Sequence, residues 1–256
     1  MNALCIQLDI VWSDPPANRR AIAELLASAD LQRGDLVVLP EMFSTGFSMD
    51  AATLAEPPDG PTATFLSESA GKFGVYLLGG LARRYGETFR NEAVLLAPDG
   101  SLIGRYWKMH PFSPSSEADH YTPGDEAVVI PVGKFQLAPA ICYDLRFPEL
   151  FRSAAGGGAD LIAVIANWPA QRSDHWACLL RARAIENQAY VVGVNRCGTD
   201  PNHTYAGGSV IIDPQGNVLA RAGDDQCVIG APLDSDALNR WRDQFPALRD
   251  IRRDVT

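Results

Sequence analysis

Short apolar runs alternate with helical patterns along almost the whole chain. Runs rich in Val, Ile and Leu and bounded by turn residues indicate strands. Helices are indicated where apolar residues recur every three or four positions, as Ile22, Leu25, Leu26 and Ala29 do. The predicted strands are residues 3–10, 35–40, 75–81, 134–141, 160–166, 189–195 and 226–233. The predicted helices are residues 16–31, with Gly34 closing it, and 61–73, 146–154, 173–188 and 235–244.

Two turn signals predict hairpins among these units. Pro98-Asp99-Gly100 separates apolar runs at 91–97 and 101–107, and the residues 213–216 separate 209–212 from 217–220. Units of strand and helix interleaved with hairpins favour an α/β protein with mixed sheets covered by helices. No linker-like stretch divides the chain, so residues 1–256 are expected to form a single domain.

Composition narrows the classes of function. The chain of 256 residues is 46% hydrophobic, which is enough for a full core, and its net charge of −9 disfavours nucleic acid as a partner. It has neither a signal-like start nor an apolar run of about 18 residues, so no membrane association is expected. Five cysteines without CxxC spacing argue against a disulfide framework and a zinc site, and free thiols predict a cytoplasmic protein.

Three reactive side chains follow predicted strands. Cys142 stands between an apolar run and a helical pattern, where a thiol can be exposed next to backbone N–H groups, including that of Tyr143. Glu41 follows the strand at 35–40, and Lys108 follows the hairpin. A carboxylate can activate a thiol, and an ammonium can stabilise an oxyanion. Each also has a plain interpretation: a buried inert cysteine, a solvated loop glutamate and a surface lysine.

The neighbourhoods of these residues resemble a known family. The blocks Leu39-Pro40-Glu41-Met42-Phe43, Tyr106-Trp107-Lys108-Met109-His110-Pro111-Phe112 and Ile141-Cys142-Tyr143-Asp144-Leu145-Arg146-Phe147-Pro148-Glu149 are similar to the three catalytic blocks of the nitrilase superfamily of carbon–nitrogen hydrolases, in the same order. The likeness continues through residues 166–170, 175–176 and 181–190. Pro111 departs from the pattern, since relatives more often carry an aliphatic residue there.

This resemblance implies a fold and a set of roles. It implies a four-layer α-β-β-α sandwich, with Glu41 as general base, Lys108 stabilising the intermediate and Cys142 as nucleophile. A second glutamate is implied on the loop after the lysine, and Glu117 is the best match. Its plain interpretation is an exposed acid on the segment 109–124, whose three prolines predict a surface excursion able to cover a pocket. Family enzymes generally pair through helices, which implies a homodimer or a higher homo-oligomer.

Within the superfamily the chain most resembles bacterial omega-amidases, which hydrolyse the terminal amide of 2-oxoglutaramate and 2-oxosuccinamate. Such a reaction proceeds through a thioester and needs no cofactor and no metal. Its small-molecule substrate carries a distal carboxylate that a planar guanidinium suits, for which Arg172 is the first candidate and Arg146 the second. Arg146 is instead expected to form a structural ion pair with Glu149 or Asp144.

Phe43, Phe112 and Trp168 are candidate walls of the substrate pocket, with core packing as the alternative. Other substrates, namely an N-carbamoyl amide, an aliphatic amide or a nitrile, stay open, and so does a non-catalytic oligomeric scaffold. A thiol protease using His110 is disfavoured because it leaves the glutamate and lysine blocks unexplained. The spacing of the remaining histidines does not suggest metal ligands.

Overall fold

Two six-stranded mixed sheets lie face to face in the computed structural model, which describes residues 1–252. The first sheet has the order β14-β1-β2-β3-β4-β5 and the second the order β13-β12-β9-β8-β7-β6. The strands of the first sheet are β1 (Asn2–Gln7), β2 (Leu36–Val38), β3 (Tyr76–Tyr85), β4 (Thr88–Leu96), β5 (Leu102–Trp107) and β14 (Cys227–Pro232). Those of the second are β6 (Ile130–Val132), β7 (Phe135–Ile141), β8 (Leu161–Ala166), β9 (Tyr190–Asn195), β12 (Val210–Ile212) and β13 (Val218–Arg221).

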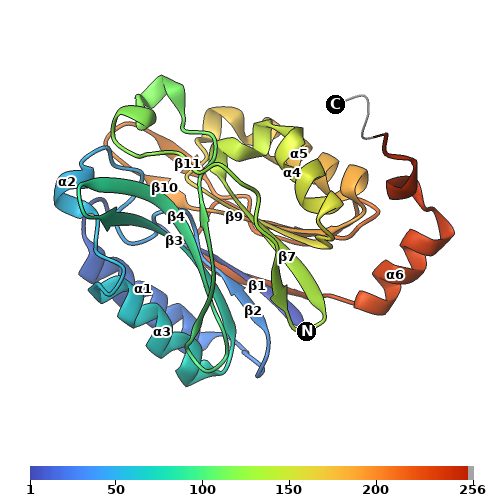
Figure 1. Cartoon of the computed structure of the whole chain (residues 1–256). Coiled ribbons are helices and arrows are strands. Elements are labelled where there is room, and N and C mark those ends of the chain that lie inside the picture. The colour runs from blue at the N-terminus through green and yellow to red at the C-terminus, as the bar shows by residue number, and fades with distance from the viewer. Residues whose placement is uncertain (253–256) are drawn as a thin grey trace.

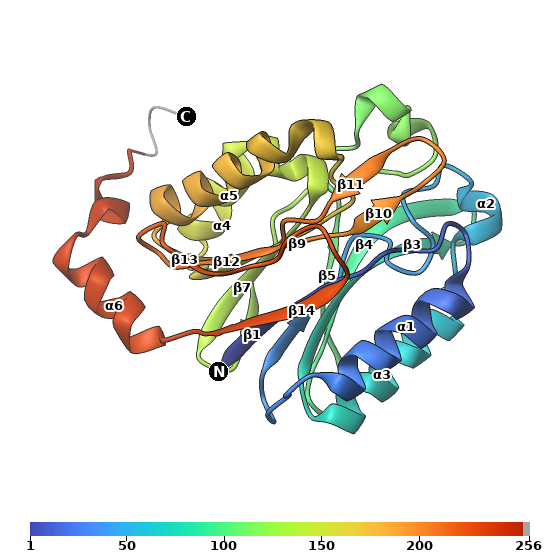
Figure 2. The ribbon, with the colours of Figure 1, turned by 180° about the vertical axis from the view of Figure 1, so that it is seen from behind.

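Helices cover the outer face of each sheet (Figure 1, Figure 2). The helices α1 (Pro15–Ser28) and α3 (Pro61–Phe73) lie on the first sheet, and α4 (Pro148–Gly156) and α5 (Ser173–Asn187) lie on the second. The short α2 (Ala51–Leu54) lies in the chain between β2 and α3, and α6 (Ser235–Gln244) follows β14. The four-layer α-β-β-α sandwich implied by the resemblance is therefore confirmed.

Strand periodicity explains how the first sheet packs on both faces. Val38 belongs to the apolar cluster that fills the space between the two sheets and continues under α4 and α5, whereas its neighbour Val37 belongs to the cluster under α1 and α3, because successive strand residues face opposite sides. Both clusters are built from fully buried side chains, with Val164 and Val192 on the second sheet and Ile22 and Leu66 on the covering helices. This burial explains the nearly continuous apolar runs in the sequence.

Most observed boundaries lie within a few residues of the predicted ones, and three differences are larger or were not predicted at all. Helix α1 ends at Ser28, and Gly34 does not close it, since Gly34 lies in the following loop with φ +86°. Strand β3 continues to Tyr85 because it pairs in a hairpin with β4, which was not predicted. A separate ribbon of β10 (Cys197–Thr199) and β11 (Thr204–Ala206) was also not predicted.

The segment after β5 contains the short 3-10 helices η1 (Ser113–Ser115) and η2 (Glu117–Asp119). Its residues Phe112, Pro114 and Ser115 line a pocket, as expected for an excursion that covers one. Within residues 1–252 no helix has the length and apolar character needed to cross a membrane.

Candidate active site

Strand ends from both sheets meet at one site. Lys108 directly follows β5 of the first sheet, and Cys142 directly follows β7 of the second. Glu41 lies shortly after β2, and Asn167 directly follows β8. Because the two sheets pack face to face, these side chains converge at one end of the sandwich.

Two glutamates contact the Lys108 ammonium. Lys108 Nζ donates to Glu41 Oε1 at 3.0 Å and to Glu117 Oε2 and Oε1 at 2.8 and 3.1 Å. Glu41 and Glu117 are fully buried and Lys108 is almost so. The plain interpretations as a solvated glutamate, an exposed loop acid and a surface lysine are therefore wrong.

The side chain of Asn91 and two backbone N–H groups orient the glutamates. Asn91 of β4 donates from Nδ2 to Glu41 Oε1 at 2.7 Å and to Glu117 Oε1 at 2.9 Å. The backbone N–H of Asn167 donates to Glu41 Oε2 at 2.8 Å, and that of Phe112 donates to Glu117 Oε2 at 2.6 Å. Each carboxylate oxygen therefore has at least one donor, which fixes both side chains in one orientation.

The charges of the glutamates decide the ionisation of the lysine. Burial by itself lowers the pKa of Lys108, but the negative charges of Glu117 and Glu41 outweigh it and raise the pKa above its ordinary value. Lys108 is therefore an ammonium throughout the neutral range and can serve as a fixed positive charge.

Cys142 occupies a strained turn beside this cluster. Its φ of +49° lies in the left-handed region that residues with a Cβ rarely adopt, and its Sγ lies 3.8 Å from the carbonyl oxygen of Asn167. Burial raises the pKa of the Cys142 thiol well above its usual range; Glu41 raises it further, whereas Lys108 lowers it. The resting side chain is therefore a neutral thiol that needs a base in order to react.

The turn after Cys142 is a short 3-10 helix, η3 (Cys142–Arg146). Tyr143 is its second residue, so its N–H has no acceptor within the helix. Tyr143 also lines the pocket that contains Cys142.

Asp144 connects the turn of Cys142 to the chain that carries Lys108. Its buried carboxylate accepts from Tyr106 Oη at 2.7 Å, from the backbone N–H groups of His110 and Ile141 at 2.9 Å each, and from the His110 ring at 2.8 Å. These bonds join residues on either side of Lys108 to residues on either side of Cys142. Asp144 therefore helps to hold the lysine and the thiol at a fixed separation.

Gly80 of β3 allows the backbone of Glu41 to approach closely. A Cβ at this position would lie 2.6 Å from Glu41 Cα and 2.8 Å from Met42 N. Real Cβ atoms do not come this close to backbone, so only glycine fits without displacing the glutamate.

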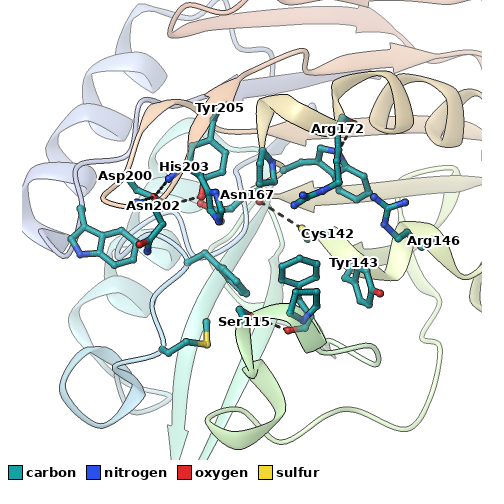
Figure 3. Close-up of a pocket in the computed structure, with 17 residues that line it drawn as sticks. Ser115, Cys142, Tyr143, Arg146, Asn167, Arg172, Asp200, Asn202, His203 and Tyr205 are labelled. Atoms are coloured by element: carbon teal, nitrogen blue, oxygen red, sulfur yellow. Dashed lines mark hydrogen bonds between the residues drawn. The ribbon is translucent and has the colours of Figure 1, made fainter.

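A pocket of about 400 Å³ opens above the thiol (Figure 3). Phe112 and Trp168 line it, as the sequence predicted. The prediction for Phe43 is wrong: its side chain is fully buried in the cluster under α1 and α3, near Leu66. Phe47 lines the pocket instead, with the Lys108 ammonium 5.0 Å from its ring centroid.

Both candidate arginines line the pocket. The guanidinium of Arg146 lies 4.8 Å from the Trp168 ring centroid, and that of Arg172 lies 5.6 Å from the Phe112 ring centroid. Within residues 1–252 neither forms an ion pair, so the expected pairing of Arg146 with Glu149 or Asp144 is wrong. Arg146 Nη2 lies instead 3.3 Å from His175 Nδ1.

Asn91 and Asn167 are site residues that the sequence analysis did not single out. A signal was present for each: Asn91 begins the apolar run at 91–97, and Asn167 directly follows an apolar strand. A buried polar residue in such a place requires a partner, which here is Glu41 in both cases.

The site can be compared with known proteins. A model of the carbon-nitrogen hydrolase family matches residues 3–243. The omega-amidase YafV of Yersinia enterocolitica is 41% identical to this chain, and the match covers 96% of this chain and 94% of the relative. The 2-oxoglutaramate amidase of Bacillus subtilis is 34% identical, and the match covers 98% of this chain and 97% of the relative. Among solved structures, XC1258 of Xanthomonas campestris, a CN-hydrolase superfamily protein with an arsenic adduct in its active site, superimposes with a TM-score of 0.93 at 35% identity, covering 98% of this chain and 97% of its own.

Proposed function

The chain belongs to the carbon–nitrogen hydrolase family, and we propose that within this family it is an omega-amidase. Its substrates are short 2-oxo dicarboxylate monoamides such as 2-oxoglutaramate and 2-oxosuccinamate, and its products are the dicarboxylate and ammonia. The observation that carries the proposal is the buried cluster of Glu41, Lys108 and Glu117 beside the neutral thiol of Cys142. The names of the similar proteins support the choice of substrate.

Glu41 is the proposed general base and Cys142 the nucleophile. Glu41 takes the thiol proton as sulfur attacks the amide carbon, which suits a thiol whose raised pKa keeps it neutral until substrate binds. Lys108 and the N–H of Tyr143 stabilise the oxyanion. Glu117 acts through Lys108, because it touches the ammonium and holds it in place.

Two further steps follow the attack of sulfur on the amide carbon. The C–N bond breaks as Glu41 returns the proton to the leaving nitrogen, so that ammonia departs and a thioester remains on Cys142. Water deprotonated by Glu41 attacks this thioester and releases the carboxylic acid and the thiol. Apart from water, these steps use only groups of the chain itself.

Arg172 is the proposed partner of the distal carboxylate, with Arg146 as the second candidate. Both arginines line the pocket. Although the chain has a net charge of −9, neither guanidinium is paired with an acid among the described residues. A carboxylate held by two charge-assisted hydrogen bonds is the ligand that such a group prefers.

Ammonia release from 2-oxoglutaramate, N-carbamoyl amino acids, pentanamide and simple nitriles tests the proposed function. We expect turnover of 2-oxoglutaramate, and Arg172→Gln should lower its kcat/KM roughly a hundredfold while changing that of uncharged pentanamide little. Arg20→Gln, which alters an exposed arginine of α1, is the matched control. Turnover of only the carbamoyl compounds or the nitriles would contradict the assignment.

We also propose that the protein forms a homodimer through its helices, including α4, and acts in the cytoplasm. The five cysteines are free in the described chain, as suits a reducing compartment. Light scattering after size-exclusion chromatography measures the subunit number, and a monomer at micromolar concentration would contradict the dimer.

A further inference from the structure

Cys142 lies between two chemically different ends of the pocket (Figure 3). Arg146 and Arg172 lie on one side of the thiol, and Asp200, Asn202 and His203 lie on the opposite side. The first pair forms the arginine end. We call the end lined by Asn202 and His203 the amine end.

The amine end is a preformed structure on the β10–β11 ribbon. The carboxylate of Asp200 accepts from the backbone N–H groups of Asn202 and His203 at 2.7 Å each and from Tyr205 Oη at 2.6 Å. The fully buried Arg196 supports this ribbon: its guanidinium lies 4.4 Å from the Tyr205 ring centroid and donates to Thr199 O at 2.9 Å. These three donors hold the carboxylate of Asp200 in one orientation on the ribbon.

Apolar side chains also line this pocket. Trp12 packs against Gly46, where a Cβ would lie 2.9 Å from its ring, and Phe47 and Met49 follow Gly46 in the chain and line the same pocket. The N–H of Cys197 donates to Leu8 O at 3.0 Å, which ties the ribbon to the segment that leads to Trp12. An aromatic or branched apolar group therefore finds a matching surface here.

An unsubstituted amide does not use this space. If the arginine end takes the distal carboxylate, the amide nitrogen points toward the amine end, and release of ammonia needs almost no room there. The pocket of about 400 Å³ nevertheless falls in the range of sites that hold drug-sized ligands, about 300–1000 Å³.

We propose that the amine end is a leaving-group subsite, and that the enzyme also hydrolyses 2-oxo dicarboxylate monoamides whose amide nitrogen carries an uncharged apolar or aromatic substituent. The inference rests on the proposed omega-amidase function. The step is the same: sulfur bonds to the acyl carbon, the C–N bond breaks, and the nitrogen takes the proton from Glu41. A primary amine then leaves in place of ammonia, and water completes the hydrolysis.

The test compares 2-oxoglutaramate with its N-methyl and N-benzyl derivatives, following 2-oxoglutarate and the released amine. We expect N-benzyl-2-oxoglutaramate to be hydrolysed with a KM about tenfold below that of the N-methyl compound, because its ring reaches the apolar wall. Asn202→Trp fills the amine end from an exposed loop position and retains the bond from its backbone N–H to Asp200. It should lower kcat/KM for the N-benzyl compound, relative to 2-oxoglutaramate, by at least about tenfold.

Asn239→Trp, at an exposed position on α6, is the matched control and should leave that ratio unchanged. Turnover of 2-oxoglutaramate without any release of benzylamine or methylamine would overturn the subsite but leave the proposed function intact. An unchanged ratio in Asn202→Trp would also overturn it. Benzylamine release without turnover of 2-oxoglutaramate would support the subsite and overturn the proposed function, and no turnover of any of the three compounds would overturn both.

Discussion

Replacement of Glu117 by Gln tests whether the second glutamate serves the reaction or only the fold. The substitution removes one of the two negative charges in contact with Lys108 and keeps the size of the side chain. Glu117 Oε1 accepts from Asn91 and Lys108, and Oε2 accepts from Lys108 and Phe112. A glutamine side chain has a single acceptor oxygen, so its NH2 group must face at least one of these donors and leaves that donor without an acceptor.

The expected losses of stability and of rate follow from this unpaired donor. A buried donor left without an acceptor costs about 1–3 kcal/mol, so the free energy of unfolding should fall by about that amount. The freed ammonium also turns toward Glu41, and a displacement of about 1 Å at a catalytic group can cost roughly a hundredfold in rate. Since Lys108 is proposed to act on the oxyanion, the loss should appear in kcat rather than in KM.

Initial rates of ammonia release from 2-oxoglutaramate measure the kinetic effect, and urea unfolding measures the stability. Glu68→Gln, at an exposed glutamate of α3, is the control and should change neither quantity. If Glu117→Gln lowers the stability while kcat stays within about tenfold of the wild-type value, a change of about 1.4 kcal/mol in barrier, the proposed role of Glu117 in holding Lys108 for the reaction is refuted.

Three further predictions follow from buried contacts. Asp144→Asn replaces a carboxylate that accepts from three residues, and the free energy of unfolding should fall by about 1–3 kcal/mol in urea titrations; an unchanged midpoint would contradict the linking role of Asp144. Gly80→Ala should reduce kcat/KM roughly a hundredfold, because its methyl group displaces the backbone of Glu41; full activity would show that the loop adjusts freely. Burial, with a smaller contribution from Cys227, raises the pKa of the Cys5 thiol above that of the unfolded chain, so above about pH 8.5 the folded state keeps a proton that the unfolded state loses. The free energy of unfolding should therefore fall with rising pH above about 8.5. Cys5→Ala should reduce the slope of this free energy against pH by up to about 1.4 kcal/mol per pH unit in urea titrations at several pH values. Equal slopes in the wild type and the variant would contradict the raised pKa of Cys5.

Local patterns were sufficient to predict the parts of the fold that depend on local chemistry. Gly60-Pro61 and the apolar spacing fixed helix α3 at Pro61–Phe73, and α6 at Ser235–Gln244 also has its predicted bounds. The placement of Glu41, Lys108 and Cys142 near strand ends was predicted for the same reason. Their convergence was expected from the resemblance to a family rather than from spacing.

Side-chain direction in irregular segments could not be predicted. Met42 and Gly46 both have positive φ, so the chain after Glu41 turns in a way that buries Phe43 and presents Phe47 to the pocket. Asp144 points inward to donors from β5 and the following segment, and this explains why it does not pair with Arg146. Contacts between residues far apart in the sequence decide both outcomes.

The positive φ of Cys142 has a consequence for how the enzyme can evolve. A left-handed backbone costs a residue with a Cβ about 1–2 kcal/mol, and glycine avoids this cost. Mutation to glycine would therefore remove the proposed nucleophile and at the same time relax the turn. A population freed from selection for hydrolysis could thus gain thermal tolerance by losing its sulfur.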